Sequence, residues 1–202
     1  MVEQGKERLY YKLGDPVDEK KARHIMRYNF VADQLKDKNV ATILDFGCGA
    51  GYGTKLLATA FPKATITGYD ISEEAIEYAK QNNEATNVTF TTNPEVLQKQ
   101  HDVITLIDCI EHLTLDKQNE ILQTLTNNNK QTTYFISTPL SNFVGQSPTN
   151  PYHIACHTKQ TFSEMLAKQF NYEYWIIDWY FYRQMNVEEP YGAIMAICEV
   201  LK

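Results

Sequence analysis

The chain has 202 residues, a formal net charge of −6 and a pI near 5.4. This length suits one domain with a sizeable core, and the balance of 43% hydrophobic and 22% charged residues excludes a disordered or low-complexity chain. The acidic balance offers no overall positive surface for a phosphate backbone, which disfavours a nucleic-acid partner.

The cysteines and the apolar segments indicate in which cellular compartment the protein is expected. Four cysteines are scattered without a C-x-x-C pair, which argues against a zinc knuckle or a disulfide framework. The first residues form no apolar run, and no apolar stretch of 18 residues occurs, so we expect neither a signal peptide nor a membrane span. The sequence therefore predicts a cytoplasmic protein and leaves its oligomeric state open.

The first half of the chain alternates helices with strands. Residues 1–38 are polar and contain an amphipathic helix at 19–37, which we interpret as a helical lid; a solvated and partly packed helix face is the alternative. Ser72 is the expected N-cap of a later helix, with acidic residues in its first turn. Strands are expected at 41–46, 64–70 and 87–92, and helices at 54–61 and 72–83.

The second half continues this alternation and then departs from it. Strands at 102–108 and 131–138 flank a helix at 115–128, and a helix at 158–170 precedes strands at 172–182 and 191–200. Alternating elements indicate a parallel sheet linked by right-handed crossovers. The predicted fold class is α/β: one domain, 1–202, with a doubly wound, mostly parallel seven-stranded sheet and an antiparallel C-terminal edge hairpin.

A glycine-rich turn, GCGAGYG, follows the strand at 41–46 and opens a helix. In an open α/β sheet ligands bind at this edge, and glycines allow sharp bends and a close approach to the ligand. A dinucleotide fingerprint would need glycine where Tyr52 stands, and a P-loop would not place Thr54 directly after Gly53. A tight turn without any ligand is the alternative.

Asp70 closes the next strand. In doubly wound folds an acidic residue roughly 20 positions after the glycine turn accepts hydrogen bonds from a ribose diol, so a nucleoside ligand is indicated. The alternative for Asp70 is a capping carboxylate beside Ser72.

These residues together resemble the class I S-adenosylmethionine-dependent methyltransferases, whose first motif is an acidic residue, one further residue and then G-x-G-x-G. Asp45, Gly47, Gly49 and Gly51 match that motif, Asp70 matches the ribose acid, and DVITLIDCIEHL (102–113) resembles the fourth-strand segment of the family. The resemblance implies a Rossmann-like methyltransferase fold with S-adenosyl-L-methionine as the cofactor.

The resemblance also implies roles in cofactor binding. Asp45 would lie near the amino group of the cofactor, Asp70 on the ribose hydroxyls and Ile71 beside the adenine. Many members have an acidic residue after strand three, where this chain has Asn93. The implied cofactor-binding residues are Asp45, Phe46, Gly47, Cys48, Gly49, Gly51, Asp70, Ile71, Asn93, Asp108 and Cys109.

Transfer of the activated methyl group needs a positioned nucleophile, and a general base if the acceptor is a hydroxyl. Glu111 and His112 follow the fourth strand, and His153 lies beyond the fifth, so these three are the predicted catalytic residues. The alternatives are a structural imidazole at His112 and a helix-start carboxylate at Glu111.

The segment 139–157 is long for a loop, and loops of this length are usually functional. We interpret it as an acceptor-side loop. Its flanking motifs resemble a subgroup that includes ubiquinone-type O-methyltransferases and many sugar and natural-product methyltransferases, which implies a small-molecule or saccharide acceptor methylated at oxygen. The matching residues are Ser137, Thr138, Pro139, Asn150, Pro151, His153 and Thr158, whereas His157 matches nothing and is expected to be structural.

Two alternatives remain open. Small-RNA 3′-end 2′-O-methyltransferases resemble this pattern but bind a divalent metal through E-x-x-E-H and a later histidine, for which Asp108, Glu111, His112 and His153 would stand here. The acidic balance and the shorter Asp108 count against it, and the main hypothesis assigns no metal. A non-catalytic methyltransferase-like module is the other alternative, against which the intact glycines argue.

Overall fold

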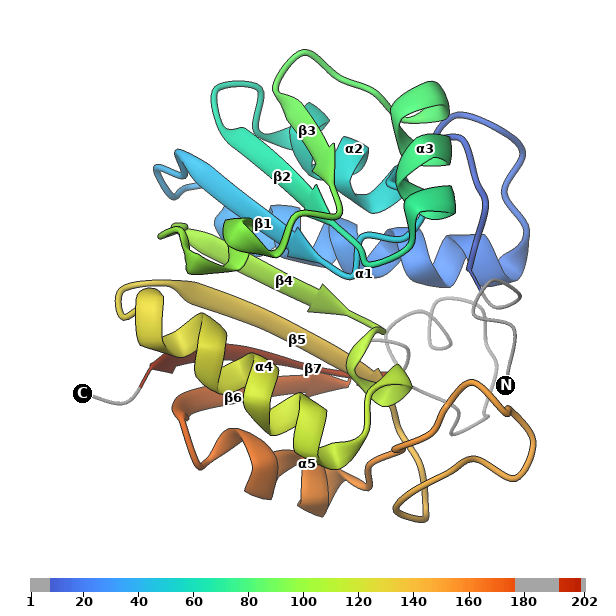
Figure 1. Cartoon of the computed structure of the whole chain (residues 1–202), viewed down its shortest axis with the longest axis vertical. Helices are drawn as coiled ribbons and strands as arrows, with labels where there is room; N and C mark the ends of the chain where they lie inside the picture. Colours follow the sequence, from blue (N-terminus) through green and yellow to red (C-terminus); the bar gives the residue numbers. More distant parts are fainter. Residues whose placement is uncertain (1–7, 177–192, 201–202) are drawn as a thin grey trace. The chain divides into compact units, whose positions relative to one another are not determined.

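The computed structural model describes residues 8–176 and 193–200. Its strands form a seven-stranded sheet in the order β3-β2-β1-β4-β5-β7-β6, parallel between β1, β2 and β3 and antiparallel where β7 pairs with β5 and β6 (Figure 1). The predicted fold class is therefore confirmed. The chain divides into two compact units at Thr105 and Leu106. We describe each unit by itself.

The first unit, which ends at Thr105, alternates helices and strands as expected. Its core contains the fully buried side chains of Ile43, Leu44 and Ile66 on two neighbouring strands. Helix α2 packs on β2 and β3, and α1 packs on α2. The elements are α1 (Glu19–Leu35), β1 (Thr42–Phe46), α2 (Tyr52–Ala60), β2 (Thr65–Tyr69), α3 (Glu73–Asn82), β3 (Val88–Thr91), the 3-10 helix η1 (Pro94–Gln98) and the start of β4 (Val103–Ile107).

Local sequence explains where the helices of this unit begin. Asp18 accepts a hydrogen bond from the Lys21 amide at the start of α1, and Ser72 accepts one from the Ala75 amide at the start of α3, as predicted. Tyr28, Val31 and Leu35 recur at helical spacing and form the buried face of α1.

Two glycines of the turn are required by packing. A Cβ atom on Gly53 would lie 2.1 Å from the ring of Tyr28, and one on Gly51 would lie 2.7 Å from Ala79 and from Phe90. Gly51 also has a left-handed φ of 81°. Both positions therefore exclude larger residues, and Gly53 admits an aromatic ring of α1 rather than a ligand.

The second unit begins at Leu106 and is centred on β5 and β7. Strand β5 is buried at all but its two end residues, and β7 is buried from Ala193 to Ala196 and at Cys198, as expected of strands covered on two faces. Helix α4 runs across the front of these strands in Figure 1 and contributes Leu122 and Leu125 to the core, while α5 contributes Phe162 and Leu166. The elements are the end of β4, η2 (Ile110–His112), α4 (Leu115–Asn128), β5 (Thr133–Pro139), α5 (Lys159–Leu166), β6 (Phe170–Ile176) and β7 (Ala193–Val200).

Some predicted boundaries were wrong by a few residues. Helix α2 starts at Tyr52 rather than 54, because the left-handed Gly51 turns the chain directly into it. Helix α5 ends at Leu166 rather than 170, because buried Phe170 pairs with Val200 as the first residue of β6. The predicted strand residues 177–182 and the connection 183–190 lie outside the described residues. None of the described helices is long and apolar enough to cross a bilayer.

Candidate functional site

The glycine-rich loop between β1 and α2 is tied to the end of β2. The amides of Gly47 and Cys48 donate to the Tyr69 carbonyl at 2.8 and 3.0 Å, and the Gly49 amide donates to Oδ2 of Asp70 at 3.0 Å. Gly49 has a left-handed φ of 52°, and a Cβ atom there would meet nothing within 4 Å. The loop thus presents an open backbone surface at Gly49 beside a carboxylate.

Asp70 is the polar centre of this first unit's site. Its Oδ1 atom accepts hydrogen bonds from the Ser72 amide and from Arg8, both at 2.9 Å. The N-cap bond of α3 belongs to Ser72 instead, so the carboxylate does not cap that helix. Ile71, the residue expected beside an adenine, is 64% exposed, so its side chain is accessible to a ligand.

Asp45 lies in an enclosed cage of hydroxyl groups. Thr54 donates to Oδ2 at 2.6 Å, and Thr105 and Tyr28 donate to Oδ1 at 2.7 and 3.2 Å. Burial raises the pKa of this carboxyl to about 6, although the three hydrogen bonds oppose the shift. The side chain has no exposed surface, so in this structure it links α1, α2 and β4 through these hydrogen bonds. Its role near a cofactor amino group stays a prediction.

Three other predicted cofactor residues have structural partners. Phe46 is buried against the ring of Tyr69, and Cys48 is buried in a cluster with Ile76, Ala79 and Phe90. Burial raises the pKa of the Cys48 thiol, which suits a packing role. The Asn93 amide oxygen accepts from the Glu95 amide and caps η1. Only one acceptor position of that oxygen remains for an adenine contact.

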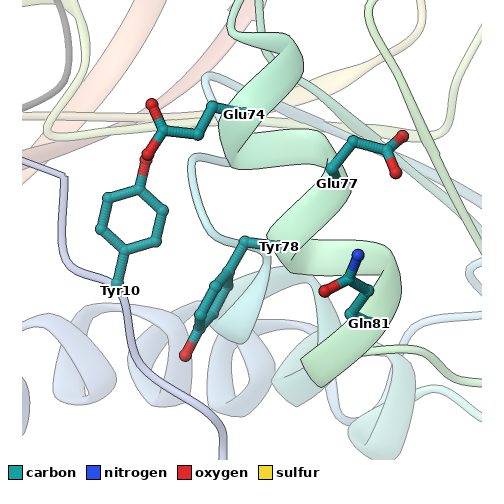
Figure 2. A pocket seen from close by; sticks show the side chains of 5 residues that line it. All are labelled: Tyr10, Glu74, Glu77, Tyr78 and Gln81. Carbon is teal, nitrogen blue, oxygen red and sulfur yellow. The ribbon is translucent and has the colours of Figure 1, made fainter.

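The segment before α1 lies along α3. Figure 2 shows the hollow between them, with the Tyr10 ring beside Tyr78 and the Tyr10 hydroxyl at the Glu74 carboxylate. The two rings are 5.1 Å apart in an edge-to-face arrangement. Burial and the acidic neighbour raise the pKa of Tyr10. Tyr10, which belongs to the predicted lid, is therefore packed on α3 through its ring.

In the second unit, Asp108 follows β4 with a left-handed φ of 47°, a conformation that is uncommon for a residue with a side chain. Ser137 on β5 stabilises it: its hydroxyl donates to Asp108 Oδ1 at 2.9 Å, and the Asp108 amide lies 3.0 Å from the same hydroxyl. Two residues singled out in separate motifs are thus in contact. Strained backbone of this kind clusters at functional sites.

The three predicted catalytic residues form one cluster. Ligand-type atoms of Glu111, His112 and His153 all lie within 4.8 Å of one another. Nδ1 of His112 lies 2.9 Å from the Tyr152 carbonyl, which fixes the hydrogen on Nδ1 and makes Nε2 the basic nitrogen. The His112 and His153 rings meet edge to face at 5.1 Å, and Glu111 is only 1% exposed.

The loop 139–157 is folded on itself. Asn150 Oδ1 accepts from the Tyr152 amide, the expected Asn-Pro turn, and Gly145 bridges to Cys156. Thr158 caps α5 as expected. His157 is buried, with Nε2 2.7 Å from Oε1 of Gln118 on α4, as its predicted structural role requires. Burial lowers its pKa.

Comparison with known proteins identifies the family. The model of the family described as "Methyltransferase domain" matches residues 18–186. The chain belongs to this family, and the predicted methyltransferase resemblance is confirmed.

Among curated relatives, a malonyl-[acyl-carrier protein] O-methyltransferase of Acetivibrio thermocellus is 48% identical over 56 residues, which are 28% of this chain and 20% of the relative. A ubiquinone biosynthesis O-methyltransferase of Haemophilus ducreyi is 28% identical over 121 residues, 53% of this chain and 50% of the relative. Each match thus spans at most half of the relative. The solved plantazolicin methyltransferase BamL, in complex with a triazolic desmethylPZN analog and SAH, has a TM-score of 0.67 at 18% identity, over 90% of this chain and 87% of its own.

Several residues of the site were missed from the sequence. Thr105 lies inside a strand that was interpreted only as buried, and Arg8 lies in a polar segment without a motif. Asn83, at the end of α3, is fully buried and bonded to both Tyr11 and Ala50. Each of these contacts joins residues that are distant in sequence, so no local sequence pattern predicts them.

Proposed function

We propose that this chain uses S-adenosylmethionine to methylate a small-molecule or saccharide acceptor, at oxygen. The observation that carries the proposal is the hydrogen bond between the Gly49 amide and Asp70, which joins the open glycine loop to a carboxylate able to accept a ribose diol. S-adenosylmethionine is the methyl donor, and it supplies an activated methyl group when bound.

The residues of the first unit fit this cofactor. The absence of a Cβ at Gly49 leaves open space at the loop, where the methionine portion would lie. Asp70 would accept from the ribose hydroxyls, and exposed Ile71 offers an apolar surface for the adenine. Gly49 would thus lie against the methionine portion of the cofactor, Asp70 against the ribose diol and Ile71 against the adenine ring.

The acceptor assignment is supported by the second unit. His112 is oriented by the Tyr152 carbonyl so that Nε2 is basic, which suits a general base for a hydroxyl acceptor. Both named relatives are O-methyltransferases. We propose that His112 and His153 contact the acceptor and that residues 139–157 select it.

Calorimetric titration with S-adenosylmethionine tests the proposal. We expect Asp70→Asn to weaken binding at least ten-fold, since an amide cannot accept both ribose hydrogen bonds. Asp102→Asn is the matched control, because Asp102 also accepts two backbone amides, those of Ala41 and Thr42, but before β4. A folded wild-type chain that binds no cofactor at millimolar concentration would falsify the proposal.

A metal-assisted reaction on RNA 3′ ends is a second candidate, and the cluster of Glu111, His112 and His153 favours it. Ligands about 2.0–2.6 Å from a shared ion lie within about 5 Å of one another, and these three meet that limit. One carboxylate and two imidazoles form a mixed oxygen and nitrogen set that can hold Mn²⁺ at some cost in fit, because imidazole prefers later transition metals. Titration with Mn²⁺ alone, followed by electron paramagnetic resonance, should show a site that His153→Ala removes. Metal-indifferent methylation of a small acceptor would eliminate this candidate.

A non-catalytic module is distinguished by turnover. An enzyme consumes many equivalents of S-adenosylmethionine when given cell extract as a source of acceptors. A binding module consumes none beyond the bound equivalent.

A further inference from the structure

Arg8 lies on the carboxylate that the proposed cofactor needs. Its Nη2 atom is 2.9 Å from Oδ1 of Asp70, and the two side chains are 19% and 8% exposed. The pair is thus still partly accessible to water on the Arg8 side, so dissolved salt can screen it.

The segment that carries Arg8 is anchored in place. The Asn83 side chain, which is fully buried, donates to the Tyr11 carbonyl at 2.8 Å and accepts from the Leu13 amide at 2.9 Å. The same amide group donates to Ala50 of the glycine loop at 2.8 Å. Tyr10 adds its ring contact with Tyr78 (Figure 2). One buried side chain therefore fixes this segment to the loop beside Asp70.

The number of hydrogen bonds that the Asp70 carboxylate can accept limits which further donors can bind to it. An ionised carboxylate offers about four lone-pair positions, two on each oxygen. Oδ1 already accepts from Arg8 and from the Ser72 amide, and Oδ2 accepts from the Gly49 amide. A ribose diol that donates to both oxygens needs one position on each, and Oδ1 has both of its positions filled.

We propose that Arg8 determines cofactor affinity by occupying the ribose subsite, so that a nucleoside binds only as the guanidinium leaves Oδ1 of Asp70. The inference rests on the proposed cofactor site. The Ser72 and Gly49 amides belong to the backbone and stay with the carboxylate, whereas the Arg8 side chain is the donor that can move. Arg8 is therefore a competitor of the diol.

The test uses S-adenosylhomocysteine as the probe in calorimetric titrations of the full chain. Because Arg8→Ala removes the competitor, the dissociation constant should fall about two- to five-fold, the range expected for a partly exposed ion pair. Arg23→Ala is the matched control: it removes the same charge from α1, where Arg23 pairs with Glu19 at 3.9 Å, and should leave affinity unchanged. Equal or weaker binding by Arg8→Ala overturns the inference, as does an equal gain in Arg23→Ala.

Salt and the diol give independent readouts. Raising the salt from about 50 to 500 mM screens the Arg8 pair, so wild-type affinity should rise toward that of Arg8→Ala, whose own affinity stays flat. The gain in affinity caused by Arg8→Ala should appear with adenosine and vanish with 2′,3′-dideoxyadenosine, which lacks the diol. A gain in affinity with both nucleosides overturns the inference. A wild-type chain that binds none of the probes instead rejects the proposed cofactor site itself.

Discussion

Thr54 donates a 2.6 Å hydrogen bond to Asp45, and with Thr105 and Tyr28 it surrounds this carboxylate with hydroxyl groups. All three donors come from different elements: α2, β4 and α1. The Asp45 carboxylate therefore links the start of α2 to β4 and α1.

The first prediction concerns the pH dependence of stability. The pKa of Asp45 is about 6 in the folded chain against an ordinary 3.8, so the folded state binds this proton more tightly. The contribution of the group is complete below about pH 4 and is lost as the pH rises through 6, a change of about 3 kcal/mol. Asp45→Asn should lack this change. Urea unfolding from pH 4 to 7 measures it, and parallel pH profiles of the two proteins would contradict it.

The second prediction concerns Gly49. Alanine at its φ of 52° costs about 1 kcal/mol of stability, with no neighbour within 4 Å to clash. The added methyl group would enter the space assigned to the cofactor, so affinity for S-adenosylhomocysteine should fall at least ten-fold. Gly145→Ala is the matched control, because Gly145 also has a left-handed φ, 101°, and open surroundings. Comparable affinity losses in both variants would refute the assignment.

The third prediction concerns His157. Burial lowers its pKa below the ordinary 6.5, so the unfolded state binds its proton more tightly. Its contribution is present above pH 6.5 and is lost as the pH falls. His157→Gln should therefore lose less stability than wild type between pH 7 and 5 in thermal unfolding. Burial also lowers the pKa of His101, so both proteins should still lose some stability as the pH falls.

The fourth prediction concerns His112 and His153. If either imidazole is the general base, its replacement by alanine should lower kcat about 10²- to 10⁴-fold at saturating cofactor. Affinity for S-adenosylhomocysteine should remain within two-fold of wild type. His24→Ala, on α1, is the control. Unchanged kcat in both variants would exclude a catalytic role for this pair.

Local patterns predicted the elements and the glycine-rich loop proposed to bind the cofactor, because strand periodicity, helix caps and the G-x-G-x-G spacing are each encoded within a few residues. The contacts that shape the site are different. Thr105 meets Asp45 across 60 positions, and Asn83 meets Tyr11 across 72. The missing side chain of Gly53 was interpreted as room for a ligand, yet the ring of Tyr28 fills that space. Such pairings depend on tertiary packing, which no local pattern of residues reveals.

Strand β7 pairs with β5 on one side and with β6 on the other, although it follows both of them in the sequence. During synthesis from the N-terminus, β6 is therefore finished before its hydrogen-bonding neighbour exists. The ribosome must release residues up to about Val200 before the backbone groups of β6 can be satisfied by β7. Until then β5 and β6 both lack a partner on the edge that β7 later occupies, and unpaired strand edges of this kind invite association with other chains.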